Sequence, residues 1–523
     1  MRLFRMNFSQ ARLWLVQAGA IFAAAALVAG CGNNYRPVVT PVNPSGPAAQ
    51  PQSLAVVVTA PSPTTPGIAT VIDYAGDSIL ATASIGPGPT AFTLDETGTS
   101  GYTINSDGTV TNMPISSNLQ TRNVSSTTLP STAKPLNLFS PSAGLWAADL
   151  QGNLADVFTA IPETFLLSIP LAPTPVMVVG PGLRGSRYFA LSQNIASPTG
   201  VECNQSPVTV GLNGIVDSIE VNSYSVSASI VLDPANPTNN PSGTKNALCP
   251  VYAVESSDSA RLYVLNRGSD TVTVINAQND TLDTCVCPST GCVNQDGQKY
   301  FCHPILPLST SAVTATSSIP PNCNHTSDPT CGGMPTTAGP VYAEYNAAKN
   351  LLVVADYTGN TISVIDVSLD EYGNDSPTFG TTYTIPVGKN PASVTVLYDG
   401  SRAYTANQAD QTVTIANLSS YTVEKTLPVT GYPRTVVSTQ NSTYGKVYVA
   451  SPNTNFLTIL RTDEDIVDTT ILLEGDILDV RVSTQNGSSG NNNNESRVPG
   501  YGQPCNLPGT ASTASLAACQ KQP

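Results

Sequence analysis

The chain has 523 residues, and its 22 basic and 36 acidic side chains give a formal net charge of −14. This acidic balance argues against broad nucleic-acid binding, which needs basic patches that neutralise phosphates. It also opposes adhesion to anionic lipid through surface charge alone.

The N-terminus has the pattern of a secretory signal over residues 1–30. Arg2, Arg5 and Arg12 precede an apolar run that ends in small residues. The following Val28-Ala29-Gly30-Cys31 resembles the lipobox of bacterial lipoproteins, which implies acylation of Cys31 and cleavage before it. An uncleaved membrane anchor with an incidental cysteine is the alternative, because a run of this length can also span a bilayer.

Residues 31–53 are rich in Pro, Gly, Asn and Ser and are expected to form a flexible tether. Gly32 follows the cysteine where inner-membrane lipoproteins of enteric bacteria carry Asp, so the resemblance favours the outer membrane over the inner. The expected location is therefore the cell envelope, with the membrane reached through the acyl anchor and the chain facing the periplasm or the exterior. Disulfides form and persist in such an oxidising compartment.

Ten cysteines remain once Cys31 is set aside, and an even number in an exported chain favours a disulfide framework. A zinc site that includes His303 or His325 stays open as an alternative, although the spacings lack paired C-x2-4-C motifs. The pairing within the central six cannot be deduced from spacing. The disulfide candidates are Cys203, Cys249, Cys285, Cys287, Cys292, Cys302, Cys323, Cys331, Cys505 and Cys519.

Residues 54–486 read as an all-β domain, because short alternating Val/Thr/Ser/Ile runs are separated by turn residues. Four segments align without gaps as strand, polar turn and strand. They are RLYVLNRGSDTVTVIN (261–276), LLVVADYTGNTISVID (351–366), RAYTANQADQTVTIAN (402–417) and KVYVASPNTNFLTILR (446–461).

These segments resemble the YVTN family of β-propeller repeats, most closely in YVLNRGSDTVTVIN. The third position of the first strand serves as a marker along the whole chain, and most steps between markers are near 44 residues, as four-stranded blades require. Eight markers predict eight blades, with seven as the alternative if one weak N-terminal marker is false. The markers are Val58, Tyr102, Trp146, Tyr188, Tyr263, Val353, Tyr404 and Tyr448.

Two marker steps are much longer than the others and predict cysteine-containing insertions near 195–249 and 284–338. Residues 54–86 supply only three strands, so we expect DILDVRVS near 477–484 to complete that blade and close the ring. Residues 487–523 read as a low-complexity tail.

The resemblance also implies a candidate binding face, since the loops joining strands b–c and d–a gather around one mouth of the channel. It places Arg267, Tyr357, Gln408 and Asn455 there, together with the segments 389–391 and 431–434. Cys203 and Cys249 are expected on the same face, where they could bond to each other. An ordinary solvated turn is the alternative for each exposed residue.

No catalytic or metal constellation is predicted, and no cofactor. The sequence has two histidines, both in the cysteine-rich stretch, and no G-x-x-x-x-G-K-[ST] loop. A calcium-dependent lactonase would need carboxylates around the channel, and the Asp residues considered for this are Asp356, Asp366, Asp399 and Asp410. Asp and Asn at turns explain these positions equally well.

The sequence therefore predicts a lipid-anchored propeller that binds a protein, peptide or glycan through its loop face or serves as a scaffold. The alternative is a channel-mouth enzyme, either a lactonase-like hydrolase or a cofactor-dependent oxidoreductase.

Overall fold

A computed structural model of the chain describes residues 54–483 with gaps. The predicted signal, Cys31, the tether and the tail lie outside the described residues. The gaps are at 96, 131–132, 134, 142–143, 151, 160–163, 181–185, 197–202, 204–211, 234–246, 286–291, 309–337 and 440.

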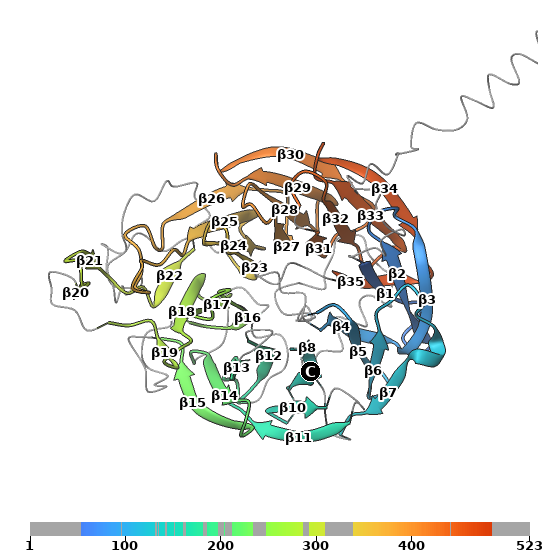
Figure 1. The fold of residues 1–523 in the computed structure, drawn as a ribbon, viewed down its shortest axis with the longest axis horizontal. Coiled ribbons are helices and arrows are strands. Elements are labelled where there is room, and N and C mark those ends of the chain that lie inside the picture. The colour runs from blue at the N-terminus through green and yellow to red at the C-terminus, as the bar shows by residue number, and fades with distance from the viewer. Residues whose placement is uncertain are drawn as a thin grey trace, which may run out of the picture. The chain divides into compact units, whose positions relative to one another are not determined.

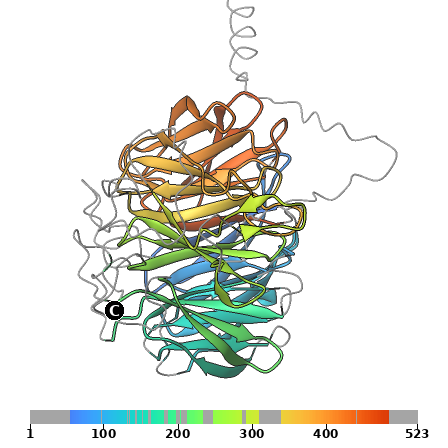
Figure 2. The same ribbon diagram turned by 90° about the vertical axis from the view of Figure 1, so that its left-hand side faces the viewer.

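Eight antiparallel sheets, each built on four strands, are arranged as the blades of a propeller (Figures 1 and 2). This confirms the predicted all-β propeller with eight blades and rules out the alternative of seven. Beyond the strands, the described residues contain one short 3₁₀ helix, η1 (Thr121–Asn123). No helix within the described ranges is long and apolar enough to cross a membrane.

The strands of each blade are called a to d from the channel outward. Blade 1 contains β35 (Asp476–Val482), β1 (Leu54–Ala60), β2 (Pro66–Asp73) and β3 (Ile79–Pro87). Blade 2 contains β4 (Pro89–Leu94), β5 (Ser100–Asn105), β6 (Thr109–Pro114) and β7 (Ser125–Thr128). Blade 3 contains β8 (Pro135–Phe139), β9 (Leu145–Asp149), β10 (Leu154–Phe158) and β11 (Phe165–Pro170). Blade 4 contains β12 (Pro175–Val179), β13 (Arg187–Ser192), β14 (Ile215–Glu220) and β15 (Ser225–Val231).

The second half of the ring follows the same order. Blade 5 contains β16 (Pro250–Glu255), β17 (Arg261–Asn266), β18 (Thr271–Asn276), β19 (Thr281–Leu282) and β22 (Ile305–Pro307). A separate hairpin is formed by β20 (Cys292–Val293) and β21 (Lys299–Tyr300). Blade 6 contains β23 (Pro340–Asn346), β24 (Leu351–Asp356), β25 (Thr361–Asp366) and β26 (Thr382–Pro386). Blade 7 contains β27 (Pro391–Val396), β28 (Arg402–Asn407), β29 (Thr412–Asn417) and β30 (Thr422–Pro428). Blade 8 contains β31 (Thr435–Ser438), β32 (Lys446–Ala450), β33 (Phe456–Arg461) and β34 (Ile466–Leu472).

The ring closes inside blade 1, as the sequence predicts. The C-terminal strand β35 pairs antiparallel with the N-terminal strand β1, with Val57 opposite Val480. β35 also contacts β4 of blade 2 and β31 of blade 8, so each a strand touches the a strand of the next blade around the full circle. Closure of this kind completes blade 1, so no blade of the ring is left with a missing strand.

Every predicted marker lies in the b strand of its blade, one for each blade, from Val58 in β1 to Tyr448 in β32. Burial explains why this strand keeps the repeat. The b strand β17 is buried at all six positions, whereas the d strand β30 is exposed at most of its positions. Substitutions and interruptions are therefore tolerated on the outer strand and excluded from the inner ones.

A polar hydrogen-bond clasp joins the end of the b strand to the start of the c strand. In blade 5, Asn266 Nδ2 donates to Oγ1 of Thr271 at 3.1 Å and to Oγ1 of Thr273 at 2.8 Å. Because these groups are buried, each bond prevents the cost of an unsatisfied polar atom. The same arrangement recurs for Asn105 with Thr109 and Thr111, and for Asn407 with Thr412 and Thr414.

Blade 6 forms this clasp with an aspartate. Asp356 Oδ2 accepts hydrogen bonds from Thr361 Oγ1 at 3.1 Å and from Ser363 Oγ at 2.6 Å. Asp356 has no exposed surface, and its other oxygen, Oδ1, has no hydrogen-bond partner. Burial raises the pKa of this carboxyl to about 7, even though the two hydroxyl donors lower it.

Candidate functional site

The b–c turns and the d–a connections lie at one end of the strands, because consecutive strands of each blade are antiparallel. We call this end the b–c face. Arg267, Tyr357 and Gln408 occupy equivalent positions on it, directly after the clasp residues of blades 5, 6 and 7. Antiparallel pairing places the a–b and c–d turns at the opposite end of the ring.

Tyr357 of blade 6 contacts both Arg267 of blade 5 and Gln408 of blade 7, and we call these three residues the turn cluster. The Arg267 guanidinium carbon lies 5.6 Å from the centroid of the Tyr357 ring, in cation–π geometry. The Tyr357 hydroxyl donates to Gln408 Oε1 at 3.1 Å. Asn455 belongs to the b–c turn of blade 8, and its carbonyl accepts the Leu473 N–H instead. The structure thus brings three of the four predicted face residues together.

Arg267 is the unusual member of the turn cluster. Its Nη1 is buried and has no hydrogen-bond partner. Burial lowers the pKa of Arg267 to about 10, although Tyr357 and Asp270 act in the opposite direction. Asp270 does not form an ion pair with it, and Asp270 Oδ1 accepts the Gly339 N–H at 2.6 Å. A desolvated cation without a paired anion is unfavourable.

Ion pairing distinguishes Arg267 from most other arginines in the described part of the chain. Five of these arginines have carboxylate partners: Arg187 with Glu220, Arg261 with Asp283 and Asp375, Arg402 with Asp465, Arg461 with Asp463, and Arg481 with Asp479. Arg122 is exposed to solvent on η1. The exceptions are Arg267 and Arg434, which lies in the d–a connection before β31.

A disulfide fixes the segment that carries Arg267. Cys203 and Cys249 are bonded, with their Cα atoms 5.4 Å apart, as expected from their shared face. The Cys249 carbonyl accepts the Arg267 N–H at 3.0 Å, and the Leu248 carbonyl accepts the Gly268 N–H at 2.9 Å. The b–c turn of blade 5 is therefore held against a covalently restrained segment.

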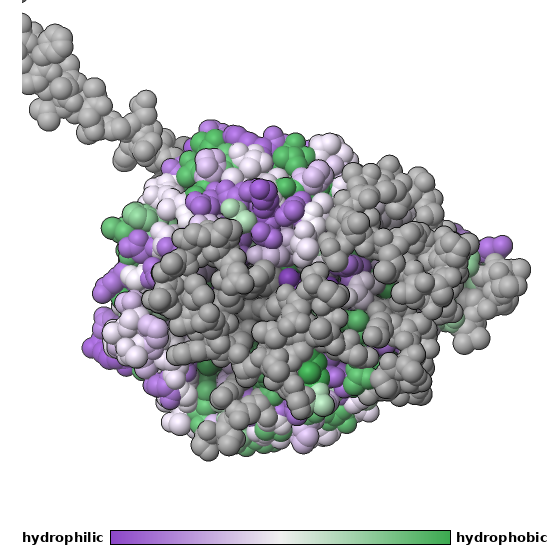
Figure 3. Space-filling view, turned by 180° about the vertical axis from the view of Figure 1, so that it is seen from behind, coloured by the Kyte–Doolittle hydropathy of each residue, from purple (hydrophilic) through white to green (hydrophobic). Residues whose placement is uncertain are grey.

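A hollow of about 470 Å³ opens beside blade 7, close to the predicted segment 389–391. Gly388, Asp410, Thr412 and Thr414 contribute to its lining. Asp410 Oδ2 accepts the Lys389 N–H at 2.8 Å, so one carboxylate oxygen is already engaged. On the face shown in Figure 3, the coloured part of the surface mixes hydrophilic, neutral and hydrophobic residues.

A second disulfide, Cys285–Cys302, closes the base of an excursion from blade 5. β19 and β22 both pair with β18, so residues 283–304 interrupt the d strand, which then resumes. Part of the predicted insertion near 284–338 thus belongs to the blade itself. Cys292, within this excursion, is disulfide-bonded as well.

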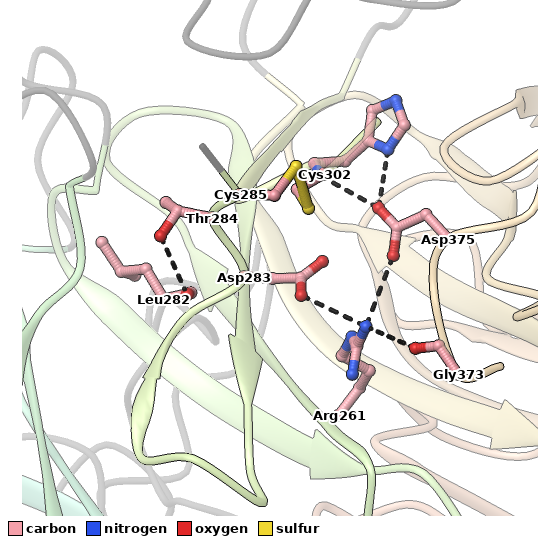
Figure 4. The surroundings of a disulfide bond; sticks show 9 residues. Arg261, Leu282, Asp283, Thr284, Cys285, Cys302, Gly373 and Asp375 are labelled. Carbon is pink, nitrogen blue, oxygen red and sulfur yellow. Dashed lines mark hydrogen bonds and ion pairs between the residues drawn. A yellow bond between two sulfur atoms is a disulfide. The ribbon is translucent and has the colours of Figure 1, made fainter. Parts of the chain in front are cut away.

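Buried charges lie beneath this disulfide (Figure 4). Arg261 Nη2 of β17 lies 3.2 Å from Asp283 Oδ1 and 3.6 Å from Asp375 Oδ1, and it donates to the Gly373 carbonyl at 3.1 Å. Asp375 Oδ2 accepts the His303 N–H at 3.0 Å and lies 2.7 Å from His303 Nδ1. We call Arg261, Asp283, Asp375 and His303 the charge cluster.

The charge cluster joins the blade 5 excursion to residues 370–380 (DEYGNDSPTFG), a loop between β25 and β26 of blade 6. The His303 ring stacks on Phe379 of the same loop, with centroids 5.4 Å apart. Burial, followed by the neighbouring Asp375, raises the pKa of Asp283. His303 is therefore placed in a buried structural contact with Asp375 and Phe379, which come from a segment that no spacing rule connects to it.

The four Asp residues considered for a lactonase site do not gather. Asp356 and Asp410 lie near the b–c face, whereas Asp366 and Asp399 lie at the c–d and a–b turns of the opposite end. Asp366 accepts the Ser368 N–H and Asp399 accepts the Ser401 N–H, which are ordinary turn contacts. Across the described ranges, no three His, Cys, Asp or Glu side chains form a group that could hold a metal ion.

Several candidate residues cannot be placed by the structure. Those outside the described residues are Cys31, Cys287, Cys323, Cys331, Cys505, Cys519 and His325.

Comparison with known proteins shows the fold and no more. No family model and no curated protein sequence matches the chain. The structure of apo AztD from Citrobacter koseri is similar with a TM-score of 0.50 and 13% identity, covering 82% of this chain and 97% of that one. The dihydro-heme d1 dehydrogenase NirN, solved in complex with DHE, is similar with a TM-score of 0.51 and 12% identity, covering 85% and 78%. Identities this low carry the β-propeller fold alone.

Proposed function

We propose that this chain is a lipid-anchored β-propeller of the YVTN type in the cell envelope, and that it binds a protein, peptide or glycan through its b–c face. Cys31 carries the acyl chains in this proposal. The outer membrane is the favoured location, with the ring in the periplasm or at the exterior. The rigid closed ring supports this role, because it presents turns from many blades in fixed positions.

The observation that carries the proposal is the turn cluster. Arg267 is partly buried, its Nη1 has no hydrogen-bond partner, and it forms no ion pair with the described residues; the Tyr357 ring and the segment fixed by the nearby disulfide hold it in place. Structural arginines in this protein are instead matched with carboxylates, as Arg261 and Arg402 show. An unmatched cation on a rigid face is a feature that a bound ligand would compensate.

Site-specific photo-crosslinking in the native envelope tests the binding role. Lys389 is exposed on the b–c face, and Tyr444, 59% exposed in the a–b turn of blade 8, provides a matched control at the opposite end. With p-benzoylphenylalanine at each position in turn, we expect a discrete adduct from position 389 and none from position 444. Equal labelling at both positions, or no adduct from position 389, would refute a binding role for this face.

The lipid anchor is tested in the same cells that are used for crosslinking. The Cys31→Ser variant is expected to lose incorporation of an alkyne-tagged fatty acid and to leave the membrane fraction. Retained membrane association with an intact first thirty residues would support the uncleaved-anchor alternative. Turnover in a lactone and dehydrogenase panel would move the assignment to the enzyme alternative.

A further inference from the structure

Arg267 and Arg434 share the b–c face, and within the described ranges neither side chain is paired with a carboxylate. Arg434 comes directly before β31, the inner strand of blade 8, and its N–H donates to the Ala450 carbonyl at 2.9 Å. Its side-chain Nε is buried and has no hydrogen-bond partner. Two arginines with unsatisfied buried nitrogens therefore occur on one end of an otherwise acidic protein.

Gln408 adds a neutral donor on the other side of Tyr357 from the contact with Arg267 in blade 5. Its Oε1 is occupied by the Tyr357 hydroxyl at 3.1 Å, which leaves the Nε2 hydrogens as the remaining polar group of the amide. Within the described residues, the Gln408 amide makes no hydrogen bond besides the one at Oε1. The turn cluster thus offers two donors, the Arg267 guanidinium and the Gln408 amide nitrogen. The Gln408 amide oxygen already accepts a hydrogen bond.

We propose that the ligand of the b–c face carries a carboxylate that pairs with Arg267 and receives a hydrogen bond from Gln408. This inference rests on the proposed binding function and names the ligand chemistry of the same site. Arg434 supplies a second positive charge on that face.

Guanidinium geometry supports a carboxylate as the paired group. The planar guanidinium presents parallel N–H groups that match the two oxygens of a carboxylate, and such charge-assisted pairs are among the strongest hydrogen bonds in proteins. The Tyr357 ring restrains the guanidinium, so part of the ordering cost is met before the ligand arrives.

Two acidic side chains in the b–c turns already accept backbone N–H groups. Asp270 accepts the Gly339 N–H, and Asp410 accepts the Lys389 N–H. Neither Asp270 nor Asp410 forms an ion pair with Arg267 or Arg434. The net charge of −14 opposes the approach of anions at long range, so recognition must come from these short-range contacts.

Titration calorimetry of the full chain in detergent with citrate as the probe tests this inference, at pH 7 and constant ionic strength. The Arg267→Gln variant is expected to bind citrate about tenfold or more weakly than the native protein, because it loses a charge-assisted pair. Arg434→Gln is expected to weaken binding less. Arg122→Gln, on the exposed helix η1, is the matched control and is expected to leave binding unchanged.

Thermal unfolding without citrate separates a ligand-binding arginine from a structural one. Since Arg267 has no counter-ion, Arg267→Gln is expected to unfold at the same or a higher temperature than the native protein. A lower Tm with unchanged citrate affinity would assign Arg267 a structural role and overturn the inference. Equal loss of affinity in Arg267→Gln and Arg122→Gln would also overturn it, because it would indicate a general charge effect.

The two proposals can fail independently. If position 389 yields the same adduct in native protein and in Arg267→Gln, the binding face stands and the carboxylate assignment fails. If citrate binding depends on Arg267 while position 389 yields no adduct, the carboxylate inference stands. The proposal that this face binds a macromolecular partner is then refuted.

Discussion

Blades 5 and 7 share their inner strands and their clasp but differ on the outside. Asn266 and Asn407 make the same pair of hydrogen bonds to threonines of the next strand. In blade 7, β30 runs along β29 without a break, whereas in blade 5 residues 283–304 separate β19 from β22. The inner strands near the channel therefore keep the repeat, whereas the outer d strand tolerates an interruption.

The difference shows how a propeller accommodates a large interruption. The outer strand buries little, so breaking it removes few core contacts. The ends of the break are then restrained twice, by the Cys285–Cys302 disulfide and by the charge cluster beneath it. A long excursion needs such restraints because loop closure has an entropic cost. Blade 7 has no interruption and needs neither.

The largest expected effect comes from removing the central cation of blade 5. Arg261→Met leaves Asp283 and Asp375 buried without their counter-ion, and we expect a loss of about 3–5 kcal/mol in the free energy of unfolding. Urea denaturation measures this loss. Arg461→Met, which breaks the more exposed pair with Asp463, is the control and should cost less than about 1 kcal/mol. Similar losses in both variants would refute a special role for the charge cluster.

Removal of the Cys285–Cys302 disulfide should have the next largest effect. The Cys285→Ser/Cys302→Ser double variant opens a loop with a sequence separation of 17. The expected loss is about 3 kcal/mol by the chain-entropy account. Limited proteolysis should cut the excursion earlier than in native protein while the b strands stay protected. Unchanged cleavage would mean that the Cys285–Cys302 bond is not needed to hold the excursion.

Making blade 6 resemble blades 5 and 7 should stabilise the protein in a pH-dependent way. The folded-state pKa of Asp356 is raised from 3.8 to about 7, so this group favours folding below pH 4 and loses that contribution as pH rises toward 7. Asp356→Asn removes this loss and is expected to add about 2 kcal/mol or more at pH 8 and far less at pH 4.

The reciprocal variant sharpens this prediction. Asn407→Asp places a buried carboxyl in the blade 7 clasp and should create a new loss of stability between pH 4 and 8. Thermal unfolding followed across this pH range measures both variants. Parallel stability curves for native protein and Asp356→Asn would contradict the raised pKa.

Much of the fold could be predicted from local sequence. The 44-residue spacing located a b strand in every blade, including the weakly matching blade marked by Val58, and the three-strand count at the N-terminus predicted β35. The clasp was also visible in three of the four aligned repeats, as Asn or Asp before the turn and Thr or Ser in the following strand. It could have been predicted from those repeats, because both partners lie within one hairpin.

The charge cluster could not be predicted in this way. Arg261 and Asp375 are more than a hundred positions apart, and they meet because a loop of blade 6 folds onto the b strand and the excursion of blade 5. The same limit applies to the turn cluster, where resemblance placed the residues on one face but not in contact. Asn455 shows this, since it shares the face and not the cluster.

The sequence by itself determined the strand order within the blades and the closing strand, because alternation and turn chemistry act over a few neighbouring residues, whereas the choice of eight blades over seven came from the structure. The tertiary structure decided which charges meet and which stay unmatched. Those outcomes depend on distances between blades, and buried charges are sensitive to such distances, so Arg261 is compensated while Arg267 is left without an anion.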